Sequence, residues 1–217
     1  MSPVKTGEDI IRIEADGVTL EGALGGVESA VGIVLFAHGS GSSRLSPRNN
    51  FVAEVLRRAG LATLLMDLLT REEDRVYERR FDIDLLSERL SGATRWLAKD
   101  KRTRDLRIGY FGASTGAAAA LQSSVEKGSR IGAIVSRGGR PDLADAYLDK
   151  VASPTLLIVG GLDDVVIELN RKAYAKIKCA KEMVIVPGAT HLFEEPGTLE
   201  EVSRLAAEWF RKYLTAQ

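Results

Sequence analysis

A Gly-x-Ser-x-Gly pentapeptide at residues 112–116 places Ser114 between an apolar run and an alanine-rich one. Residues 106–111 predict a short buried strand, and residues 115–127 predict a helix. A serine on a sharp turn from strand to helix has its hydroxyl pushed out of the sheet, and only small residues fit two positions before and after it. The pattern therefore predicts that Ser114 is a nucleophile; the alternative is an ordinary glycine-rich turn.

Two histidines are candidates for the base that a serine nucleophile needs. A serine hydroxyl is a poor nucleophile until its proton is removed, and imidazole is the suitable base near neutral pH. His191 follows a predicted strand on a loop, as the base should, and the alternative there is a chance surface histidine. His38 precedes a Gly-Ser-Gly turn, and we expect it to hold that turn by hydrogen bonding.

Three aspartates near the ends of predicted strands are candidates for the acid that orients the imidazole. Asp163 is the acid of a Gly160-x-x-Asp turn and is favoured. Its neighbour Asp164 is the competitor, and would otherwise cap a helix or lie in its first turn. Asp67 precedes the nucleophile in the chain, so a capping role is favoured for it.

The negative charge that develops on the attacked carbonyl oxygen needs two backbone N–H donors. The first expected donor is Thr115, directly after the nucleophile at the start of a helix. The second is Ser40, because Gly39 and Gly41 on either side of it allow the backbone to approach closely. Both residues would act through the main chain, which makes their side chains incidental.

Three arginines, Arg44, Arg137 and Arg140, lie on loops that follow predicted strands. One hypothesis is that they bind a carboxylate or phosphate of the substrate. The alternative, which we favour from the sequence, is that they are solvated or paired with Glu and Asp.

Short apolar runs alternate with amphipathic ones along the chain, which predicts an α/β fold with a doubly wound, mostly parallel sheet. Residues 9–25 predict an antiparallel pair at its edge, turning at residues 15–17. The other strands are expected at 31–37, 61–66, 106–111, 131–135, 155–159 and 183–186. Helices are expected at 46–59, 83–97, 115–127, 142–150 and 165–178, with a last helix opened by a capping box of Thr198 and Glu201. We expect one domain over residues 1–217, with its site beyond the carboxyl ends of the strands.

Four segments carry a resemblance to a known family: His38-Gly39-Ser40, the pentapeptide at 112–116, Gly160-x-x-Asp163 and His191. From about residue 9 to its end, the chain resembles an α/β-hydrolase of the dienelactone hydrolase-like superfamily. The order serine, aspartate, histidine is the one expected for that fold. Dienelactone hydrolases use a cysteine where this chain has Ser114, which favours ordinary ester chemistry. Related domains also occur fused to phosphoribosyltransferases, so the resemblance does not settle the biological role.

The amino-acid composition limits the kinds of molecule that this protein is expected to bind. Lys and Arg together number 30, as do Asp and Glu, so no bulk attraction to nucleic acid or an anionic membrane is expected. Cys179 is the only cysteine, which excludes an internal disulfide and a multi-cysteine metal site. No signal core or membrane-spanning run is present, so we expect a cytoplasmic protein, and no motif calls for a cofactor or metal. The charged residues 70–82 predict a solvated excursion or, alternatively, a small lid.

The sequence thus predicts a serine hydrolase that cleaves a small carboxylic ester or thioester through an acyl-enzyme on Ser114, Asp163 and His191. Two alternatives remain at this point. One is a protein of the hydrolase fold that binds a ligand without turnover, and the other is an acyltransferase that uses the same acyl-enzyme. The oligomeric state is undetermined.

Overall fold

A computed structural model describes residues 7–126 and 130–215, and an eight-stranded sheet forms the centre of this part of the chain. The strand order is β1-β2-β4-β3-β5-β6-β7-β8. β1 and β2 form an antiparallel hairpin whose second strand pairs antiparallel with β4, and all other pairs are parallel. The strands are β1 (Glu8–Ala15), β2 (Val18–Gly25), β3 (Ile33–Ala37), β4 (Ala62–Met66), β5 (Ile108–Ala113), β6 (Ile131–Arg137), β7 (Thr155–Gly160) and β8 (Lys181–Val186). The fold class predicted from the sequence is confirmed.

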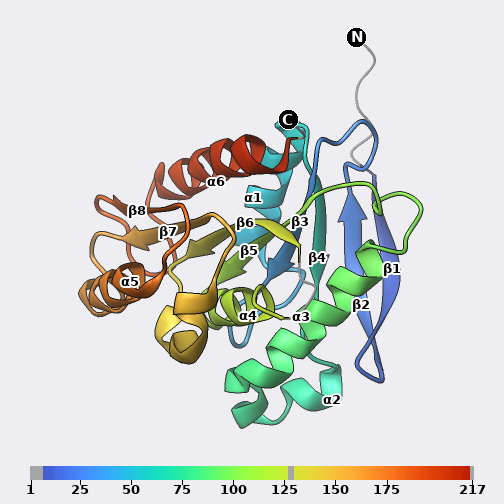
Figure 1. The fold of residues 1–217 in the computed structure, drawn as a ribbon, viewed down its shortest axis with the longest axis horizontal. Coiled ribbons are helices and arrows are strands. Elements are labelled where there is room, and N and C mark those ends of the chain that lie inside the picture. Colours follow the sequence, from blue (N-terminus) through green and yellow to red (C-terminus); the bar gives the residue numbers. More distant parts are fainter. Residues whose placement is uncertain (1–6, 127–129, 216–217) are drawn as a thin grey trace.

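Helices cover both faces of the sheet (Figure 1). They are α1 (Pro47–Arg58), α2 (Arg71–Asp74), α3 (Ile83–Leu97), α4 (Thr115–Ser123), α5 (Asp164–Lys176) and α6 (Thr198–Leu214), with 3₁₀ helices η1 (Tyr77–Phe81) and η2 (Pro141–Lys150). α1 and α6 pack together on one face, and α3, α4, η2 and α5 follow one another across the other. The predicted helix at 115–127 ends at Ser123, and Lys127 lies outside the described residues.

The central strands explain why the chain folds this way. β3, β4, β5 and β7 are buried along their whole length, as expected for apolar strands covered by helices on both faces. Two large apolar cores result, one on each face of the sheet, and Val159, Val166 and Ile167 form a small third cluster. Burial of this area supplies the main favourable free energy of folding.

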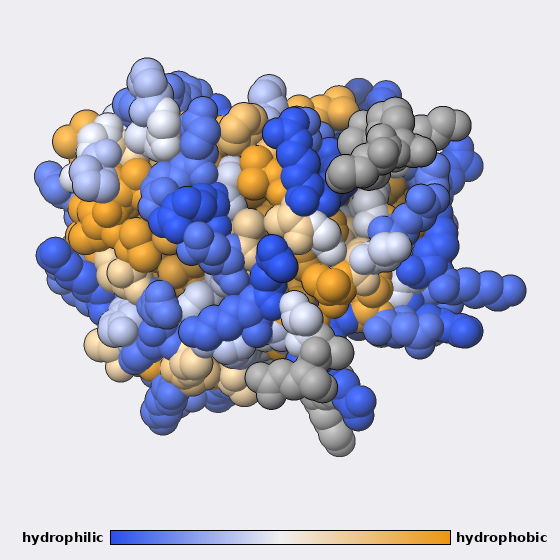
Figure 2. All heavy atoms as spheres, turned by 90° about the horizontal axis from the view of Figure 1, so that it is seen from above, coloured by the Kyte–Doolittle hydropathy of each residue, from blue (hydrophilic) through white to orange (hydrophobic). Residues whose placement is uncertain are grey.

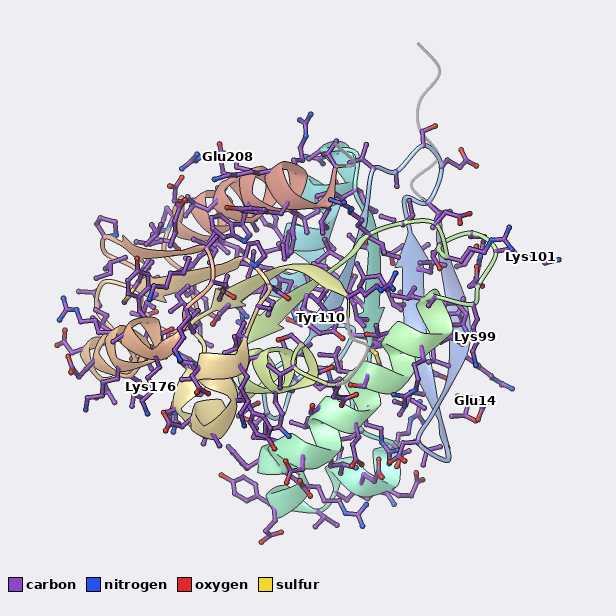
Figure 3. The ribbon with its side chains drawn as sticks, in the orientation of Figure 1. Glu14, Lys99, Lys101, Tyr110, Lys176 and Glu208 are labelled. Atoms are coloured by element: carbon purple, nitrogen blue, oxygen red, sulfur yellow. The ribbon has the colours of Figure 1, made fainter. Side chains whose placement is uncertain are left out.

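A buried tyrosine joins the helices of one face to the sheet. The Tyr110 hydroxyl lies 2.6 Å from Thr94 Oγ1 of α3 and 3.1 Å from Ser123 Oγ of α4. Figure 3 shows Tyr110 inside the molecule, whereas Glu14 and Lys176 lie at its periphery. Because a buried hydroxyl without a partner is costly, this network fixes how α3 and α4 lie on β5.

Two local expectations are wrong. α6 is preceded by Gly197 with φ of 82° and has no side-chain cap, because the Thr198 hydroxyl donates instead to the Glu195 carbonyl oxygen at 2.7 Å. The expected capping box of Thr198 and Glu201 is therefore absent. Residues 141–150 form a 3₁₀ helix kinked at Ala144 rather than an α-helix.

The charged segment 70–82 is anchored to the body of the protein. A capping box of Thr70 and Glu73 opens α2. The Glu73 carboxylate is buried and accepts a hydrogen bond from Arg89 of α3 at 2.8 Å. Arg89 also donates to the carbonyl oxygens of Ala15 and Asp16 in the β1–β2 hairpin. These contacts fasten the start of the segment to α3 and the hairpin, whereas most of residues 71–82 are exposed, as expected for a solvated excursion.

Candidate active site

Ser114 occupies a strained turn between β5 and α4. Its φ of 51° and ψ of −120° lie outside the regions that a residue with a side chain ordinarily adopts. A Cβ on Gly116 would lie 2.2 Å from the Ala37 carbonyl oxygen, and one on Gly112 would lie 2.4 Å from Ala117 Cα. The two glycines are therefore required for β5, α4 and β3 to approach one another, as the pentapeptide predicts.

The loops after β3 and β6 contact this turn directly. The Ser114 N–H donates to the Arg137 carbonyl oxygen at 3.2 Å, and the Arg140 N–H donates to the Ser114 carbonyl oxygen at 3.1 Å. On the other side, a Cβ on Gly39 would lie 3.1 Å from Ser114 Cβ. The carboxyl ends of three neighbouring parallel strands thus meet at Ser114.

His191 and Asp163 form a hydrogen-bonded pair at the same edge of the sheet. His191 Nδ1 lies 2.7 Å from Asp163 Oδ2, and their side chains are 38% and 16% exposed. A carboxylate only accepts hydrogen bonds, so Nδ1 donates and Nε2 is left as the basic atom of the imidazole. No hydrogen bond joins Ser114 to His191 within the described residues, but both side chains line one cleft.

The two candidate acids, Asp163 and Asp164, have different contacts in the structure. Asp163 precedes α5 without capping it, and its carboxylate contacts His191 instead. Asp164 is the first residue of α5. The competitor therefore lies in the first turn of the helix, where an acid favours the helix dipole.

We expect Asp163→Asn to lower kcat/KM for ester hydrolysis on the order of 10³-fold, because an amide can no longer fix the imidazole tautomer or stabilise the imidazolium. Asp164→Asn is the matched control and should stay within about threefold of the parent. Steady-state kinetics together with thermal unfolding of both variants checks this. Greater damage from Asp164→Asn, at unchanged stability, would refute the assignment.

Glu195 holds the loop that carries His191, and the sequence analysis missed this residue. The Thr190 N–H and hydroxyl both donate to the Glu195 carboxylate, at 3.1 and 2.6 Å. Phe193 between them has φ of 54° and is buried beneath the loop. The only signal in the sequence was an acid five residues after a threonine, a spacing without a recognised meaning.

Ser40 and Thr115, the expected oxyanion donors, line the same small pocket. Its volume of about 10 Å³ is the space of one water molecule. Thr115 is the first residue of α4, so its N–H has no acceptor inside the helix. Gly41 has φ of 68°, a conformation that favours glycine and turns the chain back after Ser40. Ser40 and Ser114 also line the same cleft.

His38 holds the loop after β3 with both ring nitrogens. Nδ1 lies 2.9 Å from the Gly39 carbonyl oxygen, and Nε2 accepts the Leu68 N–H at 3.0 Å. Because Nε2 accepts, Nδ1 is the donor and the ring is neutral. Burial lowers the pKa of His38, which favours the same neutral form. These contacts give His38 the loop-holding place expected from the sequence.

The three candidate arginines have different surroundings. Arg44 is paired with Asp67 at 2.9 Å and with Glu21 at 2.6 Å. This pairing also corrects the expectation that Asp67 caps a helix, because its carboxylate binds the Arg44 backbone and side chain instead. Arg140 is paired with Asp142 at 2.7 Å. Arg137 lines the cleft beside Ser114 and His191.

The cleft at Ser114 has a volume of about 220 Å³. Arg48 and Asn49 of α1 also line it, and the sequence analysis missed both because they lie inside a predicted helix. Arg48 pairs with Glu194 at 2.6 Å and so links α1 to the His191 loop. The lining residues are Gly39, Ser40, Ser42, Ser46, Arg48, Asn49, Ala113, Ser114, Arg137, His191 and Leu192.

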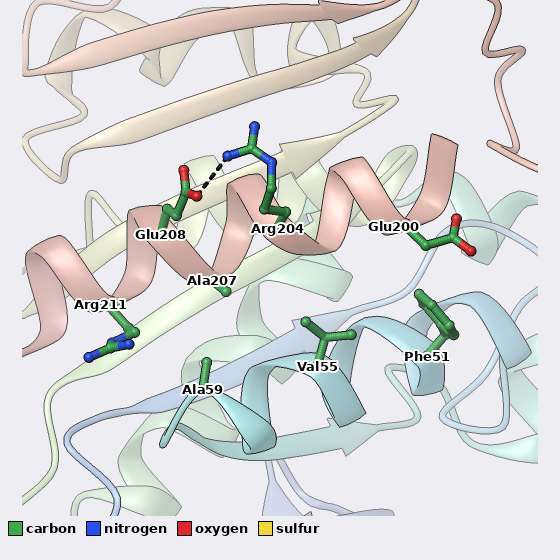
Figure 4. Close-up of a pocket in the computed structure, with 8 residues that line it drawn as sticks. All are labelled: Phe51, Val55, Ala59, Glu200, Arg204, Ala207, Glu208 and Arg211. Carbon is green, nitrogen blue, oxygen red and sulfur yellow. Dashed lines mark hydrogen bonds and ion pairs between the residues drawn. The ribbon is translucent and has the colours of Figure 1, made fainter. Parts of the chain in front are cut away.

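A larger groove of about 340 Å³ runs between α1 and α6 and shares no residue with the cleft. Seen from above, the molecule exposes apolar atoms between hydrophilic ones (Figure 2). Figure 4 shows Phe51, Val55 and Ala59 pointing toward α6, with Glu200 and Arg211 toward the two ends of the groove and Arg204 and Glu208 pointing away from α1. The described residues that line the groove include no serine, cysteine or histidine, whereas the cleft contains Ser114 and His191 together, so the cleft at Ser114 is the candidate active site.

Residues 7–126 and 130–215 contain no cluster of three or more His, Cys, Asp or Glu side chains able to hold a metal ion. The helices among these residues include none with the length and apolar character needed to cross a bilayer.

Comparison with known proteins gives the family. A model of the dienelactone hydrolase family matches residues 21–214. A solved dienelactone hydrolase from Anabaena variabilis is 55% identical, with a TM-score of 0.93 over 96% of this chain and 98% of that one. Est1E from Butyrivibrio proteoclasticus shares the fold at 16% identity, with a TM-score of 0.79 over 94% of this chain and 98% of that one.

A protein of Mycobacterium tuberculosis named as a putative phosphoribosyl transferase is 55% identical over 207 residues, which are 95% of this chain and 47% of that protein. The chain thus spans about half the length of these curated relatives. The family model, by contrast, covers most of the chain, and the Anabaena structure is matched almost from end to end. The protein belongs to the dienelactone hydrolase family, a family of hydrolases.

Proposed function

We propose that this hydrolase cleaves a small carboxylic ester or thioester, with Ser114 as nucleophile, His191 as general base and Asp163 as the acid that orients it. The proposal depends on one observation, which is that two structural features lie at the same cleft. These are the strained turn at Ser114 and the 2.7 Å bond between His191 Nδ1 and Asp163 Oδ2. A strained, half-buried serine in the same cleft as an oriented imidazole is the arrangement that nucleophilic acyl transfer requires.

The reaction proceeds in two halves. His191 Nε2 removes the Ser114 hydroxyl proton as Oγ attacks the ester carbonyl, and the oxyanion accepts hydrogen bonds from the Ser40 and Thr115 N–H groups. The tetrahedral intermediate collapses, the alcohol or thiol leaves with the proton from His191, and an acyl-enzyme remains on Ser114. Water, deprotonated by His191, attacks the acyl-enzyme, and the acid leaves as Ser114 recovers its proton.

Within the family, Ser114 stands where the dienelactone hydrolases proper have a cysteine nucleophile. A serine alkoxide forms only as its proton is transferred, whereas a thiol can ionise beforehand, so this chain depends more strongly on its base. The dependence favours ordinary esters as substrates. The phosphoribosyl transferase name belongs to relatives about twice as long, and we assign that activity to the part of them that this chain does not match.

Covalent labelling tests the proposal. A fluorophosphonate probe should add once to the intact protein, and peptide mapping should place the adduct on Ser114. A protein that binds a ligand without turnover would not be labelled, and labelling of Cys179 would also overturn the proposal. An acyltransferase would be labelled as well, but its product would depend on an added acceptor, whereas hydrolysis yields the free acid in buffer alone.

The cleft predicts a preference for short acyl chains. Its volume is about 220 Å³, and Leu192 is the only large apolar side chain among the described residues that line it. Added methylenes gain binding free energy only where an apolar wall receives them. We expect kcat/KM for p-nitrophenyl esters, measured from acetate to palmitate without detergent, to be highest at four carbons or fewer. A maximum at eight carbons or more would show that an apolar channel exists.

A further inference from the structure

The groove between α1 and α6 has no part in the proposed function. Its volume is about 340 Å³, and it shares no residue with the cleft at Ser114. On the side of α1 it is apolar, with Phe51 36% exposed and Val55 and Ala59 half-buried. Figure 4 shows that α1 and α6 run side by side in the same direction along it. The groove and the outward charged residues of α6 together form a surface, the α1–α6 face, which comprises Phe51, Val55, Ala59, Glu200, Glu201, Arg204, Ala207, Glu208, Arg211 and Lys212.

The six charged residues of α6 are arranged so that each has an opposite charge at the mirrored position along the helix, with Ala206 at the centre. The pairs are Arg204 with Glu208, Glu200 with Arg211 and Glu201 with Lys212. At about 100° per residue, the two members of each pair also lie on the same stripe of the helix surface. A second copy of α6 that runs antiparallel about a two-fold axis near Ala206 therefore presents an opposite charge to each of the six.

The order of the central pair is not the one that an isolated helix favours. Acids at the start of α6 and bases at its end suit the helix dipole. Within a helix, however, an acid four residues before a base is the more stabilising order, and Arg204 comes before Glu208. Arg204 bonds to Glu201 and Glu208 at 2.7 and 2.6 Å. These are exposed pairs that contribute little, so contacts with a second copy can replace them at small cost.

The apolar residues on the side of α1 are complementary in size. Phe51 and Val55 of α1 and its C-cap Ala59 are four residues apart, so they follow one stripe and decrease in volume along it. In an antiparallel copy about a two-fold axis at Val55, the Phe51 ring faces the small Ala59 side chain and Val55 meets its own counterpart. Figure 4 places Val55 near the middle of the stretch of α6 between Glu200 and Arg211, so one axis serves both helices.

We propose that the α1–α6 face is the contact between two copies of this chain in a two-fold symmetric dimer, with each helix antiparallel to its counterpart. Such a contact uses the same surface on both copies, which is why the surface must be complementary to itself. The face is about 25 Å long and two helices wide, which gives about 500 Å² on each copy. This area is at the lower limit for a specific interface, so we expect a reversible dimer with Kd on the order of 10 µM. The proposal does not depend on the proposed function, and both catalytic clefts stay open in the dimer.

Sedimentation equilibrium of the native chain tests the proposal first. Between about 1 and 200 µM, the average mass should rise from that of one chain toward that of two. Arg204→Glu and Glu208→Lys each place like charges together at two symmetric positions, so each should raise Kd by about 10-fold or more. Arg171→Glu, at an exposed position of α5 outside the face, is the control and should leave Kd unchanged.

Mixing the two charge variants separates a lost contact from a damaged fold. When one copy carries Arg204→Glu and the other carries Glu208→Lys, opposite charges face each other again at both symmetric positions. The equimolar mixture should therefore form dimers with nearly the native Kd, although each variant alone stays largely monomeric. A helix that is only destabilised by its substitution would not be restored by mixing.

Cross-linking tests the position of the axis. In a Cys179→Ser background, Val55→Cys should form a disulfide-linked dimer when oxidised glutathione accepts the two electrons, because position 55 meets its own counterpart. Arg58→Cys is the matched control on α1. Two copies of position 58 are about 9 Å apart along the helix, beyond the reach of a disulfide, so its cross-linking should be at least about 10-fold slower.

Three results would overturn the proposal. The first is a native chain that remains monomeric at the highest concentration, which would leave the groove to another occupant, such as the part of the longer relatives that this chain does not match. The second is a dimer whose Kd is unchanged by both Arg204→Glu and Glu208→Lys, which would place the contact on another surface. The third is equal cross-linking through positions 55 and 58.

Discussion

Replacing Ser114 with alanine is expected to lower kcat/KM for p-nitrophenyl acetate by about 10⁴-fold or more. Without the hydroxyl no acyl-enzyme forms, and only the oxyanion donors and the binding of substrate still assist attack by water. The fold should survive, because alanine is the smaller residue at a turn whose tight contacts involve Gly112 and Gly116. Steady-state kinetics and thermal unfolding, measured on the same preparation, check both statements.

Ser42→Ala is the matched control, because Ser42 lines the same cleft without lying on the strained turn. It should retain activity within about threefold of the native protein and should still be labelled by the fluorophosphonate. Residual activity of Ser114→Ala above a tenth of the native value, with contaminating esterase excluded, would mean that another residue attacks the ester.

Replacing His191 with alanine is expected to cost a similar factor of about 10⁴, because Ser114 then has no base to take its proton and none to protonate the leaving group. Since the two side chains act as a unit, the double variant Ser114→Ala/His191→Ala should be no slower than either single variant. The measurement is kcat/KM for the three variants, together with the rate of fluorophosphonate labelling of His191→Ala, which should fall in parallel.

His38→Ala is the comparison variant for His191→Ala. His38→Ala removes two hydrogen bonds that hold the loop carrying Ser40, so it should lower the free energy of unfolding as well as the rate. A larger loss of kcat from His38→Ala than from His191→Ala, at unchanged stability, would contradict the assignment of the base.

The sheet could be predicted because its strands are apolar on both faces. Residues 33–37, 62–66 and 108–113 are continuous buried runs, and any such run between amphipathic helices predicts a parallel strand. Once the strands are known, the rule that sites lie beyond their carboxyl ends predicts that the loops of Ser114, Asp163 and His191 lie at one edge of the sheet. The preference for Asp163 over Asp164 also needed the Gly160-x-x-Asp turn.

What the sequence could not provide are contacts between residues far apart in the chain. Arg44, Arg137 and Arg140 look alike in the sequence, and only folding gives Arg44 its partner Asp67 and leaves Arg137 buried beside Asn49, 88 residues away. Similarly, Thr198 with Glu201 matches the capping pattern as well as Thr70 with Glu73 does. The left-handed turn at Gly197 decides against the first pair, and no local pattern reports that turn.

The hydrogen bonds of His38 make the stability of the protein sensitive to acid. Both bonds require a neutral ring, because a protonated Nε2 can no longer accept the Leu68 N–H. The pKa of His38 is lowered in the folded protein, so below the ordinary histidine pKa of about 6.5 the unfolded chain takes up a proton that the folded chain does not. The contribution of His38 is therefore complete above that pH and declines as the solution becomes more acidic. The two histidines of this chain thus have opposite needs: in the mechanism that we propose, His191 accepts a proton in every turnover, whereas His38 must remain without a second proton for the loop beside Ser114 to keep its shape.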